Sequence, residues 1–269
     1  MMDRELLVAL AAGILQGIFE WLPISSEGNI TIVLSALGRA PEQVVAFALF
    51  LHLGTALSAT AYYHDELAAI LTRLPAWRPH RAFDGEQAIV TFLGIGTLVS
   101  GVVGITAYVT LIDAFSTLTG GVFIALVGVL LVGTGVFQYL AEDIVGDRKT
   151  PGWRDAILVG IAQGLAILPG ISRSGMTTGT LLLRGHNGPQ SFRFSFLLAI
   201  PASVGGSLLA YLDTGISVSL VAAAIALGAA AIVGYATIDA LLRIVETLPF
   251  WSVCIALGTL AALGGLLVM

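Results

Sequence analysis

The sequence predicts an all-α polytopic membrane protein made of two repeats that enter the membrane in opposite orientations. Three observations predict this fold class: a very apolar composition, a series of long apolar runs, and an internal repeat. Of the 269 residues, 57% are hydrophobic and only 11% are charged, with a mean hydropathy of +0.95. Soluble domains carry about 25% charged residues, so this chain has too little charge to cover a surface that faces water.

The internal repeat divides the chain into two halves. The segment Gly13–Ile18 (Gly-Ile-Leu-Gln-Gly-Ile) returns as Gly160–Leu165 (Gly-Ile-Ala-Gln-Gly-Leu), and the match keeps its register through the serine cluster that follows each copy. A chance match would not hold one register over so long a stretch. We therefore predict one membrane domain with a first repeat over residues 1–147 and a second over residues 148–269.

Each half begins with an apolar segment that runs into a cluster of Pro, Gly and Ser. The clusters are Leu22–Asn29 and Leu168–Gly175, and the short apolar pieces Ile30–Leu37 and Met176–Leu183 follow them. Neither member of a pair comfortably spans a hydrocarbon core of about 30 Å. We predict a re-entrant helical hairpin at the start of each half, because irregular backbone at membrane depth is tolerated inside protein or against a polar cavity. Ordinary interfacial loops are the alternative.

Three full transmembrane helices are expected after each hairpin. We place them near residues 43–62, 88–110 and 117–140 in the first half and near 192–212, 217–240 and 250–268 in the second. A hairpin that returns to its own side adds no crossing, so three spans leave the chain on the opposite side. The second half then enters inverted, and the two hairpins are expected to meet near the midplane.

The distribution of cations predicts the orientation of this multi-pass protein in the cell membrane. In the predicted topology one side carries only Arg4 and Arg39. The other side carries nine cations: Arg73, Arg78, Arg81, Arg148, Lys149, Arg154, Arg184, Arg193 and Arg243. Because cytoplasmic loops are enriched in Lys and Arg, we expect the arginine-rich loops in the cytoplasm and both termini outside.

Charge and cysteine content exclude several classes of function. The net charge is −5 and no basic stripe exists, so a nucleic-acid partner is not expected. Cys254 is the only cysteine and lies in an apolar run, so we expect a small buried hydrophobe and no internal disulfide. No metal-ligand spacing links the histidines. His64, His80 and His186 lie in or beside predicted loops and are expected to be solvated.

The second Pro/Gly/Ser cluster has the features of a phosphate site. It places Arg173 among the hydroxyls of Ser172, Ser174, Thr177 and Thr178, at a predicted helix N-terminus. Free backbone N–H groups, the helix dipole, hydroxyl donors and a forked cation all suit phosphate. The alternative is an ordinary capped helix whose arginine pairs with Glu20 for structural reasons. In the first cluster, Ser25 and Ser26 occupy the pseudo-symmetric position, so one of these hydroxyls could face the same phosphate.

Polar side chains at membrane depth are costly and usually functional. Gln16 and Glu20 lie four residues apart on one helical face, just before the first break. A carboxylate there can hold a divalent cation or act as a general base. A buried polar pair bonded to loop backbone is the alternative. His52, in the next span, is either a proton carrier or a core histidine bonded to a carbonyl.

These two clusters resemble the motifs of a known family. Gln16–Glu20 with Leu22–Ser26 resembles the first motif of the undecaprenyl-diphosphate phosphatases, the bacitracin-resistance proteins, and Pro169–Thr177 is similar to their second motif. The likeness covers essentially the whole chain. It implies the removal of the terminal phosphate from a polyprenyl diphosphate, giving inorganic phosphate and the monophosphate carrier lipid, which is thereby recycled for glycan synthesis.

The resemblance also implies a divalent cation, Mg²⁺ or Ca²⁺, and a set of site residues. By position, Glu20 is the expected metal ligand or base, Arg173 the phosphate clamp, and Ser26 the nucleophile or a phosphate contact. The other expected substrate-binding residues are Gln16, Ser25, Glu27, Asn29, His52, Ser172, Ser174 and Thr177.

The chain departs from the bacterial pattern directly after the serines. Where that pattern has threonine, glycine and histidine, this chain has Glu27, Gly28 and Asn29, a departure that looks like an archaeal branch of the family. Asn29 cannot act as a general base near neutral pH, so the base is left among Glu27, Glu20 and His52. Attack by a serine and attack by an activated water both stay open.

The alternative function is a polyprenyl-phosphate flippase, because inverted repeats with broken helices at the midplane are typical of secondary transporters. The carboxylates discriminate between the two functions. A flippase for an anion gains little from Glu20 and Glu27 beside the phosphate, whereas a metal-assisted hydrolase needs at least one. In either case the partners are a polyprenyl lipid and the bilayer. The sequence leaves the lipid chain length and a homo-oligomer open.

Overall fold

The computed structural model describes residues 4–116, 118, 120–142, 144, 146–215, 218–245 and 247–268. The described residues form eleven α-helices and two short 3₁₀ helices, with no β-strand among them: α1 Arg4–Phe19, α2 Ser26–Ala36, α3 Pro41–Tyr62, α4 His64–Arg73, η1 Leu74–Ala76, η2 Pro79–Arg81, α5 Gln87–Ser116, α6 Gly120–Glu142, α7 Trp153–Leu165, α8 Arg173–Leu183, α9 Gly188–Thr214, α10 Leu220–Val245 and α11 Phe250–Leu267. The predicted all-α class is confirmed.

Six of these helices, α3, α5, α6, α9, α10 and α11, are long and apolar enough to cross a membrane. They coincide with the six predicted spans, with ends that differ by a few residues. Many of their large apolar side chains face outward; Leu98, Leu212 and Ile232 are each 72% exposed. An apolar outer surface of this kind suits lipid and not water. The chain is a multi-pass membrane protein.

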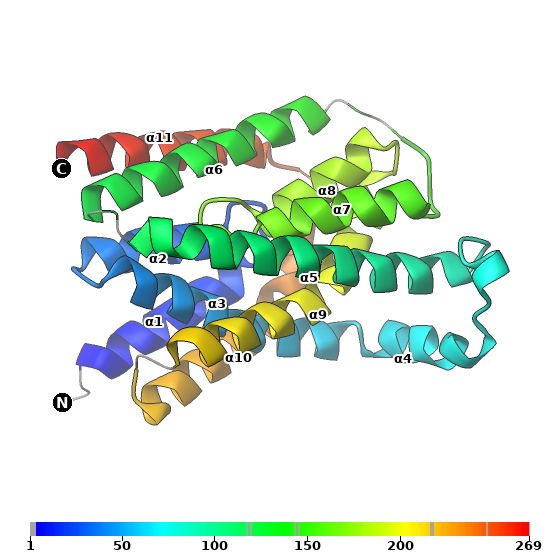
Figure 1. The fold of residues 1–269 in the computed structure, drawn as a ribbon, viewed down its shortest axis with the longest axis horizontal. Helices are drawn as coiled ribbons and strands as arrows, with labels where there is room; N and C mark the ends of the chain where they lie inside the picture. Colours follow the sequence, from blue (N-terminus) through cyan, green and yellow to red (C-terminus); the bar gives the residue numbers. More distant parts are fainter. Residues whose placement is uncertain are drawn as a thin grey trace.

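The helices run lengthwise through the molecule, and two short pairs stop in its middle (Figure 1). The pair α1 and α2 occupies the end of the molecule that holds both termini, whereas α7 and α8 occupy the opposite end, where α4 lies. The turns of the two pairs therefore approach each other at the centre.

The glycines shared by the two sequence copies have the same packing role in each. A Cβ added at Gly13 of α1 would lie 2.3 Å from the carbonyl oxygen of Ala226 in α10. A Cβ at the matching Gly160 of α7 would lie 2.8 Å from the Val99 side chain of α5. Helices in membranes associate through close backbone approach at small residues, which explains why these glycines recur in both copies.

The packing of the later spans differs between the two halves. Helix α10 packs directly on α3: the Ser58 hydroxyl donates to the Ala231 carbonyl over 2.7 Å, and a Cβ at Gly54 would lie 2.7 Å from the Leu227 carbonyl oxygen. The corresponding helices α5 and α9 line the two sides of a cavity instead. This gap lies beside the central loops.

A buried ion cluster ties the start of α7 to the end of α8. Asp155 is fully buried, and its Oδ2 lies 2.9 Å from Nη2 of Arg148 and 3.1 Å from Nε2 of His186. Its Oδ1 lies 2.8 Å from Nε of Arg184. His186 is itself fully buried, so the expectation that it is solvated was wrong. The Asp155 carboxylate contacts the His186 imidazole inside the protein. The position of His186 in a loop of the sequence does not reveal this contact.

Candidate functional site

The first central loop joins α1 to α2 and is held by hydrogen bonds within the loop and to α10. Trp21 is 1% exposed, and its indole N–H donates to the Gly234 carbonyl over 3.0 Å. Ser25 is the N-cap of α2, accepting a hydrogen bond from the Gly28 amide. In the described part of the chain Ser25 is the one non-glycine residue with a positive φ, 57°. A strained backbone conformation of this kind persists only where the surrounding contacts hold it in place, and such residues are concentrated at functional sites.

The second central loop leads into α8 and is anchored to α6. Ser172 is the N-cap of α8, and its Oγ accepts from the Gly175 amide over 3.2 Å. Thr134 of α6 accepts from the Ser172 amide and donates to the Gly170 carbonyl, both over 3.2 Å. Gly170 has a φ of 96°, and a Cβ there would lie 2.4 Å from the Val127 carbonyl oxygen. Only glycine satisfies both conditions.

The two loops touch each other, and the carboxylate of Glu20 lies where they meet. A Cβ added at Gly28 would lie 2.7 Å from the Gly170 nitrogen, so the loops pack backbone to backbone. Glu20 is 4% exposed, and its Oε1 lies 2.5 Å from Nη2 of Arg173. Its Oε2 accepts from Nε2 of Gln16 over 2.9 Å and from the Ser26 hydroxyl over 2.8 Å. The contact expected from helical spacing, Gln16 with Glu20, is thus present.

His52 is the fourth contact of Glu20. Its Nε2 lies 3.3 Å from Oε2 of Glu20, and its Nδ1 lies 2.9 Å from the Ala48 carbonyl oxygen. A carbonyl oxygen can only accept, so the tautomer with hydrogen on Nδ1 fits this contact, and the ring then turns Nε2 toward the carboxylate. Of the two roles that the sequence left open, the carbonyl-bonded histidine is present, and the same ring also contacts the central carboxylate.

A small polar pocket of about 20 Å³ lies against these groups. It is lined by Glu20, Leu22, Ser25, Ser26, Glu27, His52, Ala166, Ile171, Ser172, Arg173 and Ser174. This volume holds about one water molecule. The fold thus brings most of the predicted site residues from both halves of the chain around one point.

Three predicted residues lie behind the pocket and not on its wall. Gln16 is fully buried behind Glu20. Asn29 turns its amide to backbone, donating to the Ile24 and Ser25 carbonyls over 2.7 and 2.9 Å. The Thr177 hydroxyl lies 2.6 Å from the Ser195 hydroxyl. Their predicted roles in substrate binding stay predictions; the observed contacts support the loops.

Sequence reasoning missed two supporting residues. The Ser195 carbonyl accepts from Nη1 of Arg173 over 3.4 Å, which fixes the second arm of the guanidinium. Gln138 of α6 donates to the Pro23 carbonyl over 2.6 Å. Both lie in apolar stretches without a local motif. The one feature of the sequence that could have indicated these two residues is that each is a polar side chain inside a predicted span.

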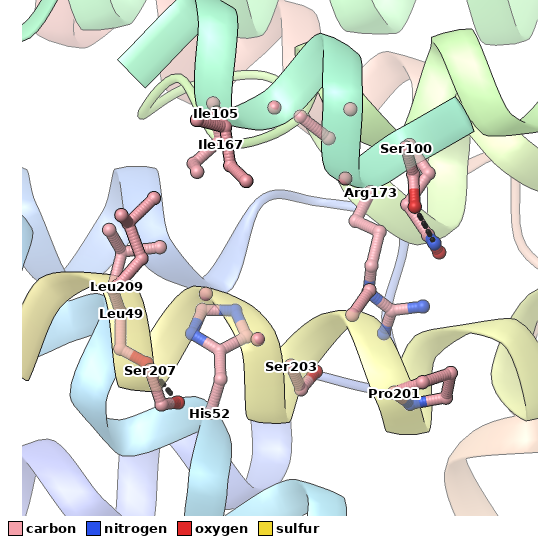
Figure 2. A pocket seen from close by; sticks show the side chains of 18 of the residues that line it. Leu49, His52, Ser100, Ile105, Ile167, Arg173, Pro201, Ser203, Ser207 and Leu209 are labelled. Atoms are coloured by element: carbon pink, nitrogen blue, oxygen red, sulfur yellow. Dashed lines mark hydrogen bonds between the residues drawn. The ribbon is translucent and has the colours of Figure 1, made fainter. Parts of the chain in front are cut away.

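A larger cavity of about 220 Å³ adjoins the polar pocket between α5 and α9. Figure 2 shows the His52 ring and the Arg173 guanidinium entering it from α3 and from the start of α8, with Ile105, Ile167 and Leu209 farther along. Small residues of α5 and α9 form much of its wall. Glu27, His52, Ala166 and Arg173 line both spaces, so they form the neck between them.

Glu27 differs from Glu20 in its contacts. It is 4% exposed, and its Oε1 has no hydrogen-bond partner among the described residues. Those residues also contain no group of three or more His, Cys, Asp or Glu arranged to hold a metal. A cation at this site would therefore need oxygen ligands from a bound molecule or water, as Mg²⁺ commonly takes from substrate phosphates. Glu27 is the carboxylate with an oxygen free for it.

Comparisons with known proteins agree over almost the whole chain. A family model described as "Bacitracin resistance protein BacA" matches residues 9–260. An undecaprenyl-diphosphatase of Haloarcula marismortui is 48% identical over 268 residues, covering 98% of this chain and 99% of that protein. Proteins of the same name from Methanococcoides burtonii and Saccharolobus solfataricus are 34% and 36% identical, and each alignment covers at least 95% of both chains.

Proposed function

The chain belongs to the BacA family of bacitracin resistance proteins, and we propose that it hydrolyses a polyprenyl diphosphate to polyprenyl phosphate and inorganic phosphate in the membrane. The observation that carries this proposal is the arrangement of Ser26, His52 and Arg173 around Glu20, in a pocket that opens into an intramembrane cavity. The comparisons give no support to the flippase that the repeat architecture allowed.

The pocket is suited to a diphosphate by its positive and donor groups. Helices α2 and α8 both begin at it, so two helix N-termini present their positive ends. Nε of Arg173 is buried without a partner among the described residues, so it is free to donate to a phosphate oxygen. The hydroxyls of Ser172 and Ser174 line the same wall. Phosphoryl transfer is accelerated mainly by such positioned charge stabilisation.

Ser26 is placed for nucleophilic attack. Its hydroxyl donates to Oε2 of Glu20 over 2.8 Å, so Glu20 is in reach of the proton that the oxygen must lose. In the proposed sequence Ser26 Oγ bonds to the terminal phosphorus, the bridging P–O bond breaks, and polyprenyl phosphate leaves. Water then hydrolyses the seryl phosphate and releases inorganic phosphate. His52 and Gln16 hold Glu20 in this position.

A divalent cation, Mg²⁺ or Ca²⁺, is part of the proposal. When bound it would neutralise part of the diphosphate charge. The resemblance assigns it to Glu20, but both oxygens of that carboxylate already accept from protein donors. The residues present fit a cation through the free oxygen of Glu27.

We further propose that α1 with α2 and α7 with α8 are re-entrant hairpins of two inverted repeats, 1–147 and 148–269. What supports this is the entry of the pairs from opposite ends (Figure 1) and the contact of Gly28 with Gly170 between their turns. The arginine-rich end, which holds α4, would then be cytoplasmic, and both termini would lie outside.

The proposed activity is tested by phosphate release from undecaprenyl diphosphate and the shorter farnesyl diphosphate. Purified protein in detergent would be assayed with Mg²⁺, with Ca²⁺ and with EDTA. We expect metal-dependent release, and Ser26→Ala should lower kcat by about a thousandfold because the attacking oxygen is lost. Ser35→Ala is the matched control: it lies on the same helix, away from the pocket, and its hydroxyl has no partner among the described residues. Absence of release by folded protein under every condition would refute the proposal.

The cavity between α5 and α9 is proposed to take the first isoprene units of the lipid. A Cβ at Gly101 of α5 would meet nothing within 4 Å, so Gly101→Phe fills the cavity without a backbone clash. We expect KM for undecaprenyl diphosphate to rise about tenfold, the order expected for the loss of one apolar contact region, with little change in kcat. Gly94→Phe, on the exposed side of the same helix, should leave both unchanged. Equal effects of the two variants would place the lipid elsewhere.

A further inference from the structure

Glu27 is a carboxylate in the neck of the site whose charge no described residue balances. It is 4% exposed, its Oε1 lacks a hydrogen-bond partner in the described part of the chain, and it faces both the polar pocket and the apolar cavity. An ionised carboxylate buried without a partner is strongly unfavourable. Some further group must balance this charge, or the side chain must be neutral.

The neighbouring positive charge is already matched by another carboxylate. The charge of Arg173 is matched by Glu20, and its other arm donates to the Ser195 carbonyl. The Ser25 hydroxyl accepts from the Gly28 amide, and the Ser26 hydroxyl donates to Glu20. Among the described residues that line the pocket, Arg173 is the one arginine or lysine, and the His52 imidazole contacts Glu20, so none of them is left to balance Glu27.

Glu27 lines the space in which the diphosphate is proposed to lie. Glu27 and Arg173 line both the polar pocket and the adjoining cavity of about 220 Å³, so a phosphate held by the guanidinium at this neck lies beside the carboxylate. A phosphate and an ionised carboxylate this close repel each other strongly unless a cation lies between them. Hard divalent cations such as Mg²⁺ are commonly bound by one or two carboxylates, substrate phosphates and water.

We propose that Glu27, and not Glu20, is the protein ligand of a divalent cation that binds together with the diphosphate. This inference rests on the proposed function, because the diphosphate supplies the remaining oxygen ligands. Glu20 then accepts the proton of the Ser26 hydroxyl and pairs with Arg173, so the two carboxylates have separate roles.

Cation binding can be measured without turnover. The probe is Mn²⁺, followed by electron paramagnetic resonance and calorimetry on the detergent-purified full chain, with and without a methylenediphosphonate analogue of farnesyl diphosphate that cannot be hydrolysed. We expect saturable binding of a single Mn²⁺ per chain when the analogue is present. Glu27→Gln should weaken this binding by at least about tenfold.

Two controls separate ligation from folding. Glu142→Gln removes an exposed carboxylate at the end of α6 and should leave the Mn²⁺ affinity unchanged. The thermal midpoint of Glu27→Gln should equal or exceed that of the wild type, because the change removes an unbalanced buried charge. Glu27→Asp covers the case in which the glutamine variant does not fold, and it should show a partial loss.

Each outcome has a distinct meaning. Equal Mn²⁺ affinity in folded Glu27→Gln would overturn the inference. Infrared spectroscopy gives a second way to overturn it. A carboxylic-acid band that the wild type keeps in the presence of Mn²⁺ and the analogue, and that Glu27→Gln lacks, would show that Glu27 is neutral and binds no cation. Phosphate release together with either result would leave the proposed function intact. Loss of Mn²⁺ binding in the variant, with no release by the wild type, would refute the hydrolase and leave the cation site standing.

Discussion

Replacing Arg173 with alanine is expected to lower the rate of phosphate release by about a thousandfold, the order found when a transition-state donor is removed. The guanidinium reaches the pocket at the start of α8, and its Nε has no hydrogen-bond partner among the described residues. No other arginine or lysine lines the polar pocket in the described part of the chain. Release would be measured at saturating undecaprenyl diphosphate, so that the loss appears in kcat.

A matched series separates charge from geometry. Arg173→Lys keeps the positive charge but loses the fork that donates to two oxygens, so its rate should lie between those of the wild type and Arg173→Ala. Arg173→Ala also leaves Glu20 without its guanidinium. Adding Glu20→Gln should therefore recover the thermal midpoint but not the activity. A wild-type rate in Arg173→Ala would exclude this residue as the phosphate clamp.

Replacing Asp155 with alanine is expected to lower the free energy of unfolding by about 3 kcal/mol. Removing one partner of a buried ion cluster typically costs 3–5 kcal/mol, and the low end applies because Arg148 and Arg184 are 39% and 31% exposed and can be rehydrated. His186 is fully buried and would keep no partner at Nε2. The measurement is the midpoint of thermal unfolding in detergent.

The exposed pair of His64 and Asp65 provides the control for this prediction. Asp65 is 93% exposed, so Asp65→Ala should change stability by less than about 0.5 kcal/mol. Equal shifts in the two variants would show that the Asp155 cluster contributes nothing beyond a surface pair.

The pH dependence of the Asp155 contribution has a definite sign. Burial by itself would raise the pKa of Asp155, but hydrogen bonds from His186, the Gly152 amide and Arg184, with the charge of Arg148, hold the pKa below its ordinary value. A carboxyl whose pKa is lowered in the folded state stabilises that state above its ordinary pKa of about 3.9, and this stabilisation is lost only as the pH falls through the lowered pKa. Titration of the Asp155 carboxyl should therefore add no pH dependence to the deficit of Asp155→Ala between about pH 5 and pH 8.

Local patterns in the sequence determined the helices and the chemistry of the site. Apolar runs predicted the six spans because a chain in lipid must satisfy its backbone within each helix. The second serine cluster predicted a helix N-terminus, and α8 begins at Arg173 with Ser172 as its N-cap, because a hydroxyl that accepts from a helix amide acts within three residues. The joint presence of Arg173, serines and a buried carboxylate indicated phosphate chemistry before any contact was known.

The tertiary structure alone decided which of these groups meet. The pairing of Glu20 with Arg173 joins positions 153 residues apart, and the burial of His186 depends on Asp155. The closed contact of α3 with α10 and the cavity between α5 and α9 come from similar small-residue surfaces. Because such surfaces are nearly alike on every span, the sequence pattern does not select the partner of each helix. That selection placed Glu27 beside the proposed phosphate position, with its Oε1 unpaired among the described residues.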